Sequence, residues 1–149
     1  MTAQQTTAER ASALADTHVV ENVSRELENY NLYTQDRALQ DAVVREGADW
    51  ADESLVAFGH AVGQADYLQL GFAANKYTPE FDTHDRFGNR VDLVSYHPAY
   101  HTLMDSAVRH GLHSSPWTDP RSGAHVARAA HSYLQGQVEV TPAIMALGP

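Results

Sequence analysis

Apolar residues recur along most of this chain at the three-to-four-residue spacing of amphipathic helices. Three of them between residues 30 and 48 fall on one helical face: Leu39, Ala42 and Val43. Thr34 is placed to cap this helix, Asp36 falls in its positively polarised first turn, and Gly47 is placed to end it. The pattern predicts a first helix that runs from the Thr34 cap to Gly47.

The same spacing predicts two further helices, in residues 49–63 and 64–79. Asp49 is the expected N-cap of the first and Gly63 its expected end. The second must end before Pro79. The apolar stripes of the two helices are Leu55, Phe58 and Val62 in the first, and Ala65, Leu68 and Phe72 in the second.

Residues 80–96 lose the helical spacing and become rich in β-forming residues. Phe81 and Thr83 precede a turn at residues 87–89, and a β-rich run follows from Val91 to Tyr96. This pattern predicts a short hairpin or an irregular extended excursion. Because two strands alone are marginally stable in water, we expect the hairpin to pack on the helices.

A helical pattern returns after His97. Pro98 suits the first helical position because its missing N–H would have no partner there, so His97 becomes the N-cap, and Gly111 suits the C-terminal end. The apolar face contains Tyr100, Leu103, Met104, Ala107 and Val108. We expect Leu103, Met104 and Val108 to pack against the last helix of the chain.

The last helix is predicted after a loop, with Asp119 as its cap and Pro120 as its opening residue. Its apolar side contains Val126, Ala127, Ala130, Tyr133, Leu134 and Val138. Its polar side contains His125, Arg128, Ser132, Gln135 and Glu139, while Gln137 interrupts the apolar side. Residues 121–123 precede the helix and could bind an anion, although an ordinary surface arginine is the favoured interpretation.

Four of the nine histidines lie in residues 96–117, at spacings that suggest a zinc site. Pro98 argues against it, because it places His97 outside the helix that contains His101. We expect a solvated pair between His101 and Asp105, and a helix-dipole role for His110. The sequence therefore assigns no metal-binding, catalytic or cofactor-binding residue, and a histidine-rich metal-binding protein remains the less favoured alternative.

Composition and charge narrow the functional classes. The 149 residues suffice for one globular domain, and the absence of cysteine excludes disulfides and thiolate chemistry. The formal net charge of −9 opposes contact with nucleic-acid phosphates. No stretch approaches the apolar length of a membrane span, and residues 1–16 lack the features of a signal peptide. We therefore expect a cytoplasmic protein.

Three blocks of sequence carry a resemblance to a known family. They are YNLYTQDRALQDAVVREGA (30–48), YHPAYHTLMDSAV (96–108) and DPRSGAHVARAAHSYLQGQVE (119–139). In this order and spacing they resemble the N-terminal region of AidB-type proteins, the alkylation-response branch of the acyl-CoA dehydrogenases. The resemblance covers residues 17 to about 140. It implies a mainly α, acyl-CoA dehydrogenase N-terminal-like domain with about five helices and one hairpin or extended excursion.

The resemblance also implies properties of a longer protein. Family members are FAD-binding homotetramers with a helical N-terminal domain, a central β domain and a C-terminal helical domain, and DNA binding is attributed to a basic C-terminal region. On this basis residues 1–16 are expected to be a disordered tail, 17–140 the helical domain, and 141–149 the start of the hand-over to a β domain. The family usually has a Cys-Pro pair at that hand-over, which this sequence lacks.

The segments that would bind flavin and supply the catalytic base lie beyond residue 149, so no family site residue maps onto this chain. The segment is therefore expected to act as a scaffold, without FAD or dehydrogenase activity of its own. A stand-alone helical interaction module is the alternative.

Overall fold

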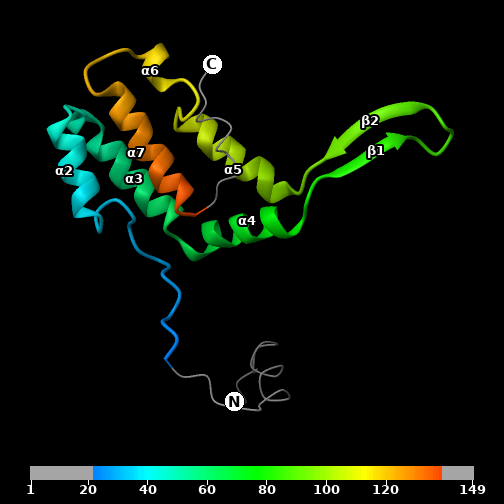
Figure 1. The fold of residues 1–149 in the computed structure, drawn as a ribbon, viewed down its shortest axis with the longest axis horizontal. Helices are drawn as coiled ribbons and strands as arrows, with labels where there is room; N and C mark the ends of the chain where they lie inside the picture. The colour runs from blue at the N-terminus through cyan, green and yellow to red at the C-terminus, as the bar shows by residue number, and fades with distance from the viewer. Residues whose placement is uncertain (1–21, 139–149) are drawn as a thin grey trace, which may run out of the picture.

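The computed structural model describes residues 22–138, which form six α-helices, one short 3-10 helix and one hairpin (Figure 1). In chain order the elements are α2 (Arg37–Arg45), η1 (Asp49–Ala51), α3 (Asp52–Val62), α4 (Ala65–Lys76), β1 (Glu80–His84), β2 (Arg90–Ser95), α5 (Pro98–Arg109), α6 (Ser115–Thr118) and α7 (Ala124–Gly136). The predicted mainly helical fold with one hairpin is confirmed. The predicted tail, 1–16, and hand-over segment, 141–149, lie outside the described residues.

The hydrophobic core lies between α2, α3 and α7, which Figure 1 shows side by side. Its buried members are Leu32, Tyr33, Val43, Ala48, Ala51, Leu55, Phe58, Val62, Ala127, Ala130 and Leu134. The predicted stripe of α3 is confirmed, because all three of its residues are buried. The small residues on α7 let its backbone approach α3 closely, which places α7 against the middle of the domain.

An extended segment before α2 crosses the C-terminal half of α3 at two glycines. The N–H of Leu32 donates to the carbonyl of Gly59 at 3.1 Å, and the N–H of Asn29 donates to that of Gly63 at 2.8 Å. A Cβ atom at Gly63 would clash with the backbone oxygen of Tyr30. Gly63 thus ends α3, as predicted, and also makes room for the crossing segment.

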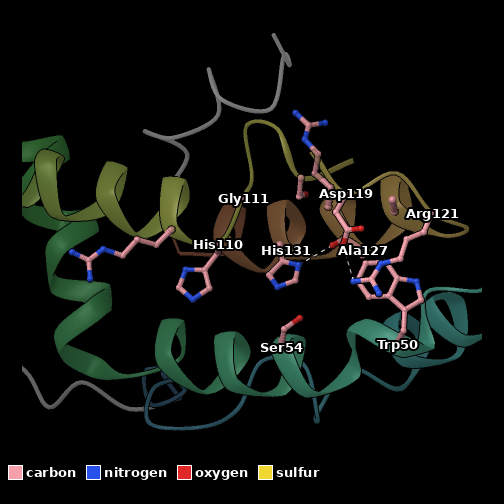
Figure 2. A pocket seen from close by; sticks show the side chains of 12 residues that line it. Trp50, Ser54, His110, Gly111, Asp119, Arg121, Ala127 and His131 are labelled. Atoms are coloured by element: carbon pink, nitrogen blue, oxygen red, sulfur yellow. Dashed lines mark hydrogen bonds and ion pairs between the residues drawn. The ribbon is translucent and has the colours of Figure 1, made fainter. Parts of the chain in front are cut away.

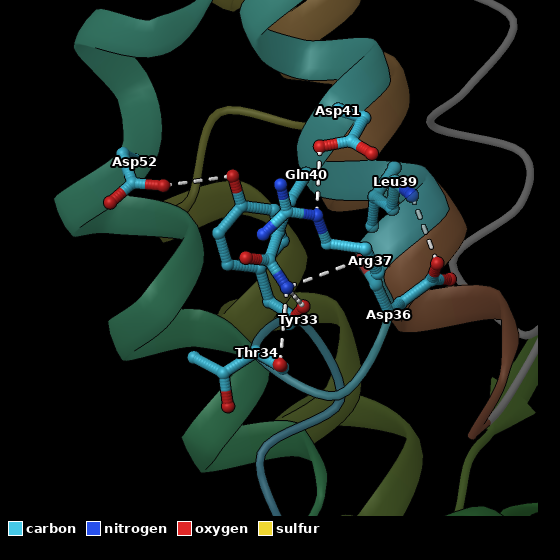
Figure 3. A network of polar contacts seen from close by, with 8 residues as sticks. All are labelled: Tyr33, Thr34, Asp36, Arg37, Leu39, Gln40, Asp41 and Asp52. Carbon is cyan, nitrogen blue, oxygen red and sulfur yellow. Dashed lines mark hydrogen bonds and ion pairs between the residues drawn. The ribbon is translucent and has the colours of Figure 1, made fainter.

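The N-terminal end of α2 differs from the prediction (Figure 3). Asp36, not Thr34, is the N-cap, and its carboxylate accepts the N–H of Leu39 at 2.9 Å. Thr34 instead lies in a turn whose N–H groups bind the Asn31 side chain, at 3.0 Å from Tyr33 and 3.1 Å from Thr34. Because Asn31 closes this turn, the N-cap lies two residues later than predicted. Gly47 has φ +73° just past the C-cap, as expected for a helix end.

The N-cap predicted at Asp49 is also wrong. Asp49 opens the short 3-10 helix η1, and α3 continues from it with Ala51 at the cap position. The side chain of Ser54 donates to the carbonyl of Ala51 at 2.8 Å. The chain therefore enters α3 through a tight turn and needs no side-chain cap there.

The start of the last helix was predicted too early. The segment expected to be a loop contains the short helix α6, Asp119 follows it as its C-cap, and α7 begins only at Ala124. Gly123 precedes α7 with φ +75°, and a Cβ there would clash with the carbonyl of Gly47. This close approach joins the end of α2 to the start of α7 and fixes where α7 begins.

The buried side of α7 differs in part from the prediction. Tyr133, expected on the apolar side, is 52% exposed, and Gln137 is exposed. Gln135 and His131 are buried instead. A partner on α4 satisfies half of the Gln135 amide, because the hydroxyl of Tyr67 donates to its Oε1 at 2.9 Å, while its Nε2 has no hydrogen-bond partner among the described residues. A buried amide with a hydrogen-bond partner is tolerated inside a core.

Helix α5 begins and ends as predicted but packs on a different neighbour. His97 caps it through Nδ1, which accepts the N–H of Ala99 at 3.2 Å, and Gly111 follows its end with φ +68°. Leu103 is buried but lies outside the core cluster that contains Leu134, and α5 makes its main contacts with α4. Val108 is exposed, so the predicted core between α5 and α7 is wrong.

The hairpin does not pack on the helices as predicted. Its strands pair Phe81 with Val94 and Asp82 with Leu93, and an irregularity beyond them leaves two residues of β2 opposite Thr83. Every residue of both strands is exposed. Figure 1 shows the hairpin extending away from the ends of α4 and α5. The described residues therefore leave both faces of this two-stranded sheet uncovered.

Candidate functional site

A cavity of about 340 Å³ lies where α3, α5, α6 and α7 meet (Figure 2). Its volume falls at the lower end of the range for small-molecule sites. The lining residues come from distant parts of the chain: Trp50, Ser54, Arg109, His110, Gly111, Ser115, Asp119, Arg121, Ala124, Ala127, Arg128 and His131. Figure 2 shows His131 reaching in from α7 above Ser54 of α3, with Trp50 and Arg121 together at one end.

His131 is the buried polar group of this cavity, with 8% of its surface exposed. Its Nδ1 lies 2.9 Å from the carbonyl oxygen of Ala127, which only accepts, so Nδ1 carries a proton. Burial lowers the pKa of His131, and the nearby charge of His110 lowers it further, although the Ala127 bond acts in the opposite direction. The ring is therefore neutral near pH 7 and presents Nε2 as an acceptor.

Aromatic contacts fix the two histidine rings beside the core. The centroid of Phe58 lies 4.4 Å from that of His110 and 5.3 Å from that of His131, and the two imidazoles are 6.5 Å apart. Nδ1 of His110 also lies 2.8 Å from the carbonyl oxygen of Ser106. These contacts hold both rings in place, so each can present one remaining nitrogen in a defined direction.

The other end of the cavity is built around an arginine stacked on an indole. The guanidinium of Arg121 lies 3.4 Å from the centre of the Trp50 ring, and its Nη2 is 3.0 Å from Oδ2 of Asp119. The Trp50 N–H donates to the carbonyl of Ser122 at 2.9 Å. Nε of Arg128 donates to the carbonyl of Leu112 at 2.6 Å. The guanidinium groups of Arg121 and Arg128 are thus both positioned by specific contacts.

The histidines that drew attention in the sequence are dispersed. His97 caps α5 and stacks on Tyr77 at 4.8 Å between ring centroids. His101 makes edge contacts with Tyr96 and Tyr100, while Asp105 pairs with Arg109 at 2.9 Å. The predicted pair between His101 and Asp105 is therefore wrong, because an arginine one turn further on takes the carboxylate.

Sequence reasoning missed His131 and Trp50 as cavity residues. A signal for His131 was present, because it follows Ala127 by four residues and Ala130 by one, at the edge of a small-residue stripe. Trp50 had no comparable signal. Its place depends on the contact between the end of α2 and the start of α7, which no local pattern encodes.

A second surface of interest lies on the hairpin and its junctions with α4 and α5. Seven large side chains here are well exposed, and together we call them the arm surface: Tyr77, Phe81, Phe87, Val91, Leu93, Val94 and Tyr96. Tyr96 stacks on Tyr100 at 4.2 Å between centroids, which orders the base of the hairpin. Scattered exposed apolar residues are common, but seven gathered on one protruding element are typical of an interaction surface.

The sequence of this chain matches the family profile of the adaptive response protein AidB N-terminal domain over residues 22–146. The chain belongs to the AidB family. A relative is the AidB protein of Escherichia coli (strain K12), which carries a provisional name as an acyl-CoA dehydrogenase. It is 46% identical over 124 residues, which are 83% of this chain and 23% of the relative.

Two solved structures share the fold of this AidB-family domain. One is Caenorhabditis elegans ACDH-11, solved in complex with C11-CoA, with a TM-score of 0.68 and 19% identity over 85% of this chain and 22% of that one. The other is the apo form of Bd2924, with a TM-score of 0.65 and 21% identity over 83% of this chain and 25% of that one. The AidB-family chain thus spans about a quarter of the length of the proteins it matches.

Residues 22–138 of this AidB-family domain contain no group of three or more His, Asp or Glu side chains arranged to hold a metal ion. None of their helices has the length and apolar character needed to cross a bilayer. Absence of metal binding stays a prediction, which elemental analysis of the purified protein tests.

Proposed function

We propose that this chain is the N-terminal scaffold domain of a longer AidB-type flavoprotein and is not catalytic alone. In this proposal the longer protein binds FAD and is an acyl-CoA dehydrogenase-like oxidoreductase of the DNA alkylation response, working as a homotetramer in the cytoplasm. The partners of the segment are the β domain and C-terminal domain of the same protein. Any contact with DNA is made by the C-terminal region, because this segment carries a net charge of −9.

The observation that carries the proposal is the uncovered arm surface. A two-stranded hairpin is marginal without a packing partner, and here Phe81, Leu93 and Val94 remain 59%, 54% and 45% exposed. The chain also spans only about a quarter of the relatives it matches. Both facts support a segment that is completed by contact with further protein.

The residues of this segment do not fit FAD on their own. The cavity at His131 has a volume of about 340 Å³, which suits a small ligand. A flavin dinucleotide is larger, and its ring nitrogens require an enclosing set of hydrogen-bonding groups. We therefore derive no flavin chemistry from these residues and assign flavin binding to the remainder of the longer protein.

Complementation with the Escherichia coli relative tests the scaffold role. The relative would be produced without the segment that matches this chain, and the 46% identity supports an exchange of the two segments. We expect this chain to co-purify with that remainder and to increase its retention of FAD, measured by flavin absorbance. Alone, the chain should be colourless, inactive towards acyl-CoA and unable to bind duplex DNA, and should form dimers or soluble aggregates by light scattering.

Paired variants locate the contact. Phe81→Ser combined with Val94→Ser should weaken association with the remainder by about tenfold or more, because it removes two apolar side chains from the arm surface. Val44→Ser on α2 changes an equally exposed apolar residue outside that surface and should have no effect. A yellow monomer with stoichiometric flavin would contradict the proposal. A stable colourless monomer that does not bind the remainder of the relative would favour a stand-alone interaction module.

A further inference from the structure

The cavity between α3, α5 and α7 gathers positive charge in an acidic chain. Of the ten Lys and Arg residues in the sequence, three line it: Arg109, Arg121 and Arg128. The one carboxylate among the lining residues is that of Asp119, which pairs with Arg121, and Arg109 pairs with Asp105 outside the lining. The cavity thus keeps an excess of positive charge, whereas the chain as a whole has 19 acidic residues and a net charge of −9. Such a local reversal of sign favours an anion over a neutral or cationic ligand.

We propose that this cavity binds a small molecule that carries a phosphate or carboxylate group on an apolar body. Nothing in the scaffold role requires such a site, so the proposal stands apart from it. The apolar body would occupy the part of the cavity lined by Gly111, Ala124 and Ala127, whose small side chains leave room. The anionic group would lie at the arginine end.

Arg121 is the residue best placed to hold the anion. Its guanidinium carbon lies 3.4 Å from the centre of the Trp50 ring, and the Trp50 N–H is itself held by the carbonyl of Ser122 at 2.9 Å. The ion pair with Asp119 uses Nη2, and no other described residue forms a hydrogen bond or ion pair with the remaining N–H groups. A guanidinium fixed in this way loses little entropy on binding and can donate two parallel bonds to an oxyanion.

Asp119 and Arg128 are two further charged residues of the cavity lining. Asp119 competes with a bound anion for Arg121 and therefore lowers the affinity of the cavity for that anion. Nε of Arg128 donates to the carbonyl of Leu112, and its guanidinium carbon lies 5.2 Å from the centre of the Trp117 ring. Arg128 thus adds a positioned positive charge to the cavity lining.

The middle of the cavity offers uncharged hydrogen-bonding groups. Figure 2 shows the side chains of Ser54 and His131 pointing toward one another across the cavity. Ser54 uses its proton on the carbonyl of Ala51, and His131 uses its Nδ1 proton on that of Ala127. Both therefore present lone pairs to the cavity, which suits a hydroxyl or another donor on the ligand.

The experiment measures binding of simple aromatic anions to the 149-residue chain. Phenyl phosphate and benzoate carry the two candidate anionic groups on the same ring, and phenol is the neutral control. Isothermal titration calorimetry at low ionic strength gives the affinity. Tryptophan fluorescence gives a second readout, because the two tryptophans of the sequence are Trp50 in the cavity and Trp117 beside Arg128.

We expect saturable binding of at least one anion with one site per chain, and the tighter of the two identifies the group as phosphate or carboxylate. Phenol should bind at least tenfold more weakly, because it lacks the charge that the arginines recognise. Absence of saturable binding by both anions, or binding of phenol as tight as theirs, would overturn the proposal. The arginines would then have only a structural role around α6.

Two substitutions at the arginine end should change the affinity in opposite directions. Arg121→Gln should weaken binding about tenfold or more, and Asp119→Asn should tighten it, because the first removes a ligand contact and the second removes its competitor. Arg37→Gln is the matched control, since Arg37 also pairs with an aspartate, Asp41, but lies on α2 outside the cavity. Far-UV circular dichroism checks the fold of each variant. Equal affinity of Arg121→Gln and the unmodified chain would overturn the assignment.

Discussion

The helical core and the hairpin arm of this domain are built in opposite ways. In the core, α7 packs on α3 through small residues such as Ala127 and Ala130, and large side chains of the two helices, such as Leu55 and Leu134, are fully buried. In the arm, β1 and β2 contact each other, and every residue of both is exposed. The core therefore contains its own packing partners, whereas the arm presents apolar residues for which the described chain supplies none.

The helical core therefore accounts for the stability of the domain, and the hairpin arm provides a surface for association with other protein. Burial of apolar surface is the dominant favourable term in folding, so the free energy of unfolding must come mainly from α2, α3 and α7. The arm surface contributes little burial in the isolated chain and gains it only on association. Changes in the core should affect stability, and changes in the arm should affect association.

The largest effect is expected where two backbones touch. Gly123→Ala would place a methyl group against the carbonyl of Gly47 at a residue with φ +75°, so it combines a clash with backbone strain. We expect a loss of about 4 kcal/mol or failure to fold, measured by urea unfolding. Gly136→Ala is the matched control on the same helix, where a Cβ meets nothing within 4 Å. It should be neutral or stabilising by up to about 1 kcal/mol, and a large loss there would show that α7 ends differently.

A core truncation should have the next largest effect. Leu134 is fully buried on α7, so Leu134→Ala should cost about 2–5 kcal/mol through lost apolar burial and the cavity left behind. His125 is on the exposed side of the same helix, and His125→Ala should stay within about 0.5 kcal/mol of the unmodified chain. Denaturant unfolding of both variants gives the comparison, and similar costs would mean that the buried face of α7 is misassigned.

A smaller effect is expected from the polar contact that ties the core to the start of α3. The hydroxyl of Tyr33 donates to Oδ1 of Asp52 at 2.9 Å (Figure 3), and burial together with that carboxylate raises the pKa of Tyr33 to about 12. Tyr33→Phe should cost about 1 kcal/mol near neutral pH.

The pH dependence of that cost follows from the direction of the shift. Between the ordinary pKa of about 10 and the folded value of about 12, the folded state binds more protons than the unfolded state. The contribution of Tyr33 is therefore complete below pH 10 and is lost as the pH rises through this window. The difference in unfolding free energy between the two proteins should shrink across it, and a difference that stays constant would contradict the raised pKa.

Local patterns predicted those parts of the fold that depend on neighbouring residues in the chain. The cap at His97, the stop at Gly63 and the buried stripe of α3 all follow from spacing and from the backbone preferences of Pro and Gly. The early start assigned to α7 was wrong because Gly123 is fixed by its contact with Gly47, which is distant in sequence.

The cavity was less predictable than the fold for the same reason. His131 lies beside a small-residue stripe that marks a buried face, so its burial could have been anticipated. The approach of Trp50 to Arg121 could not, because it requires the end of α2 and the start of α7 to be joined first. The burial of Gln135 was likewise not predictable from its polar side chain, since the hydrogen bond to its Oε1 comes from Tyr67 on another helix.

The smallest effect on stability, and the sharpest test of the comparison, is expected in the arm. Phe81 is 59% exposed and pairs across the hairpin with Val94, so Phe81→Ser removes little buried surface from the isolated chain. Its free energy of unfolding should remain within about 0.5 kcal/mol of the unmodified value, while light scattering should show less self-association. If Phe81→Ser instead cost as much as Leu134→Ala, the hairpin would have to pack on the helices in solution, and the arm surface would belong to the core.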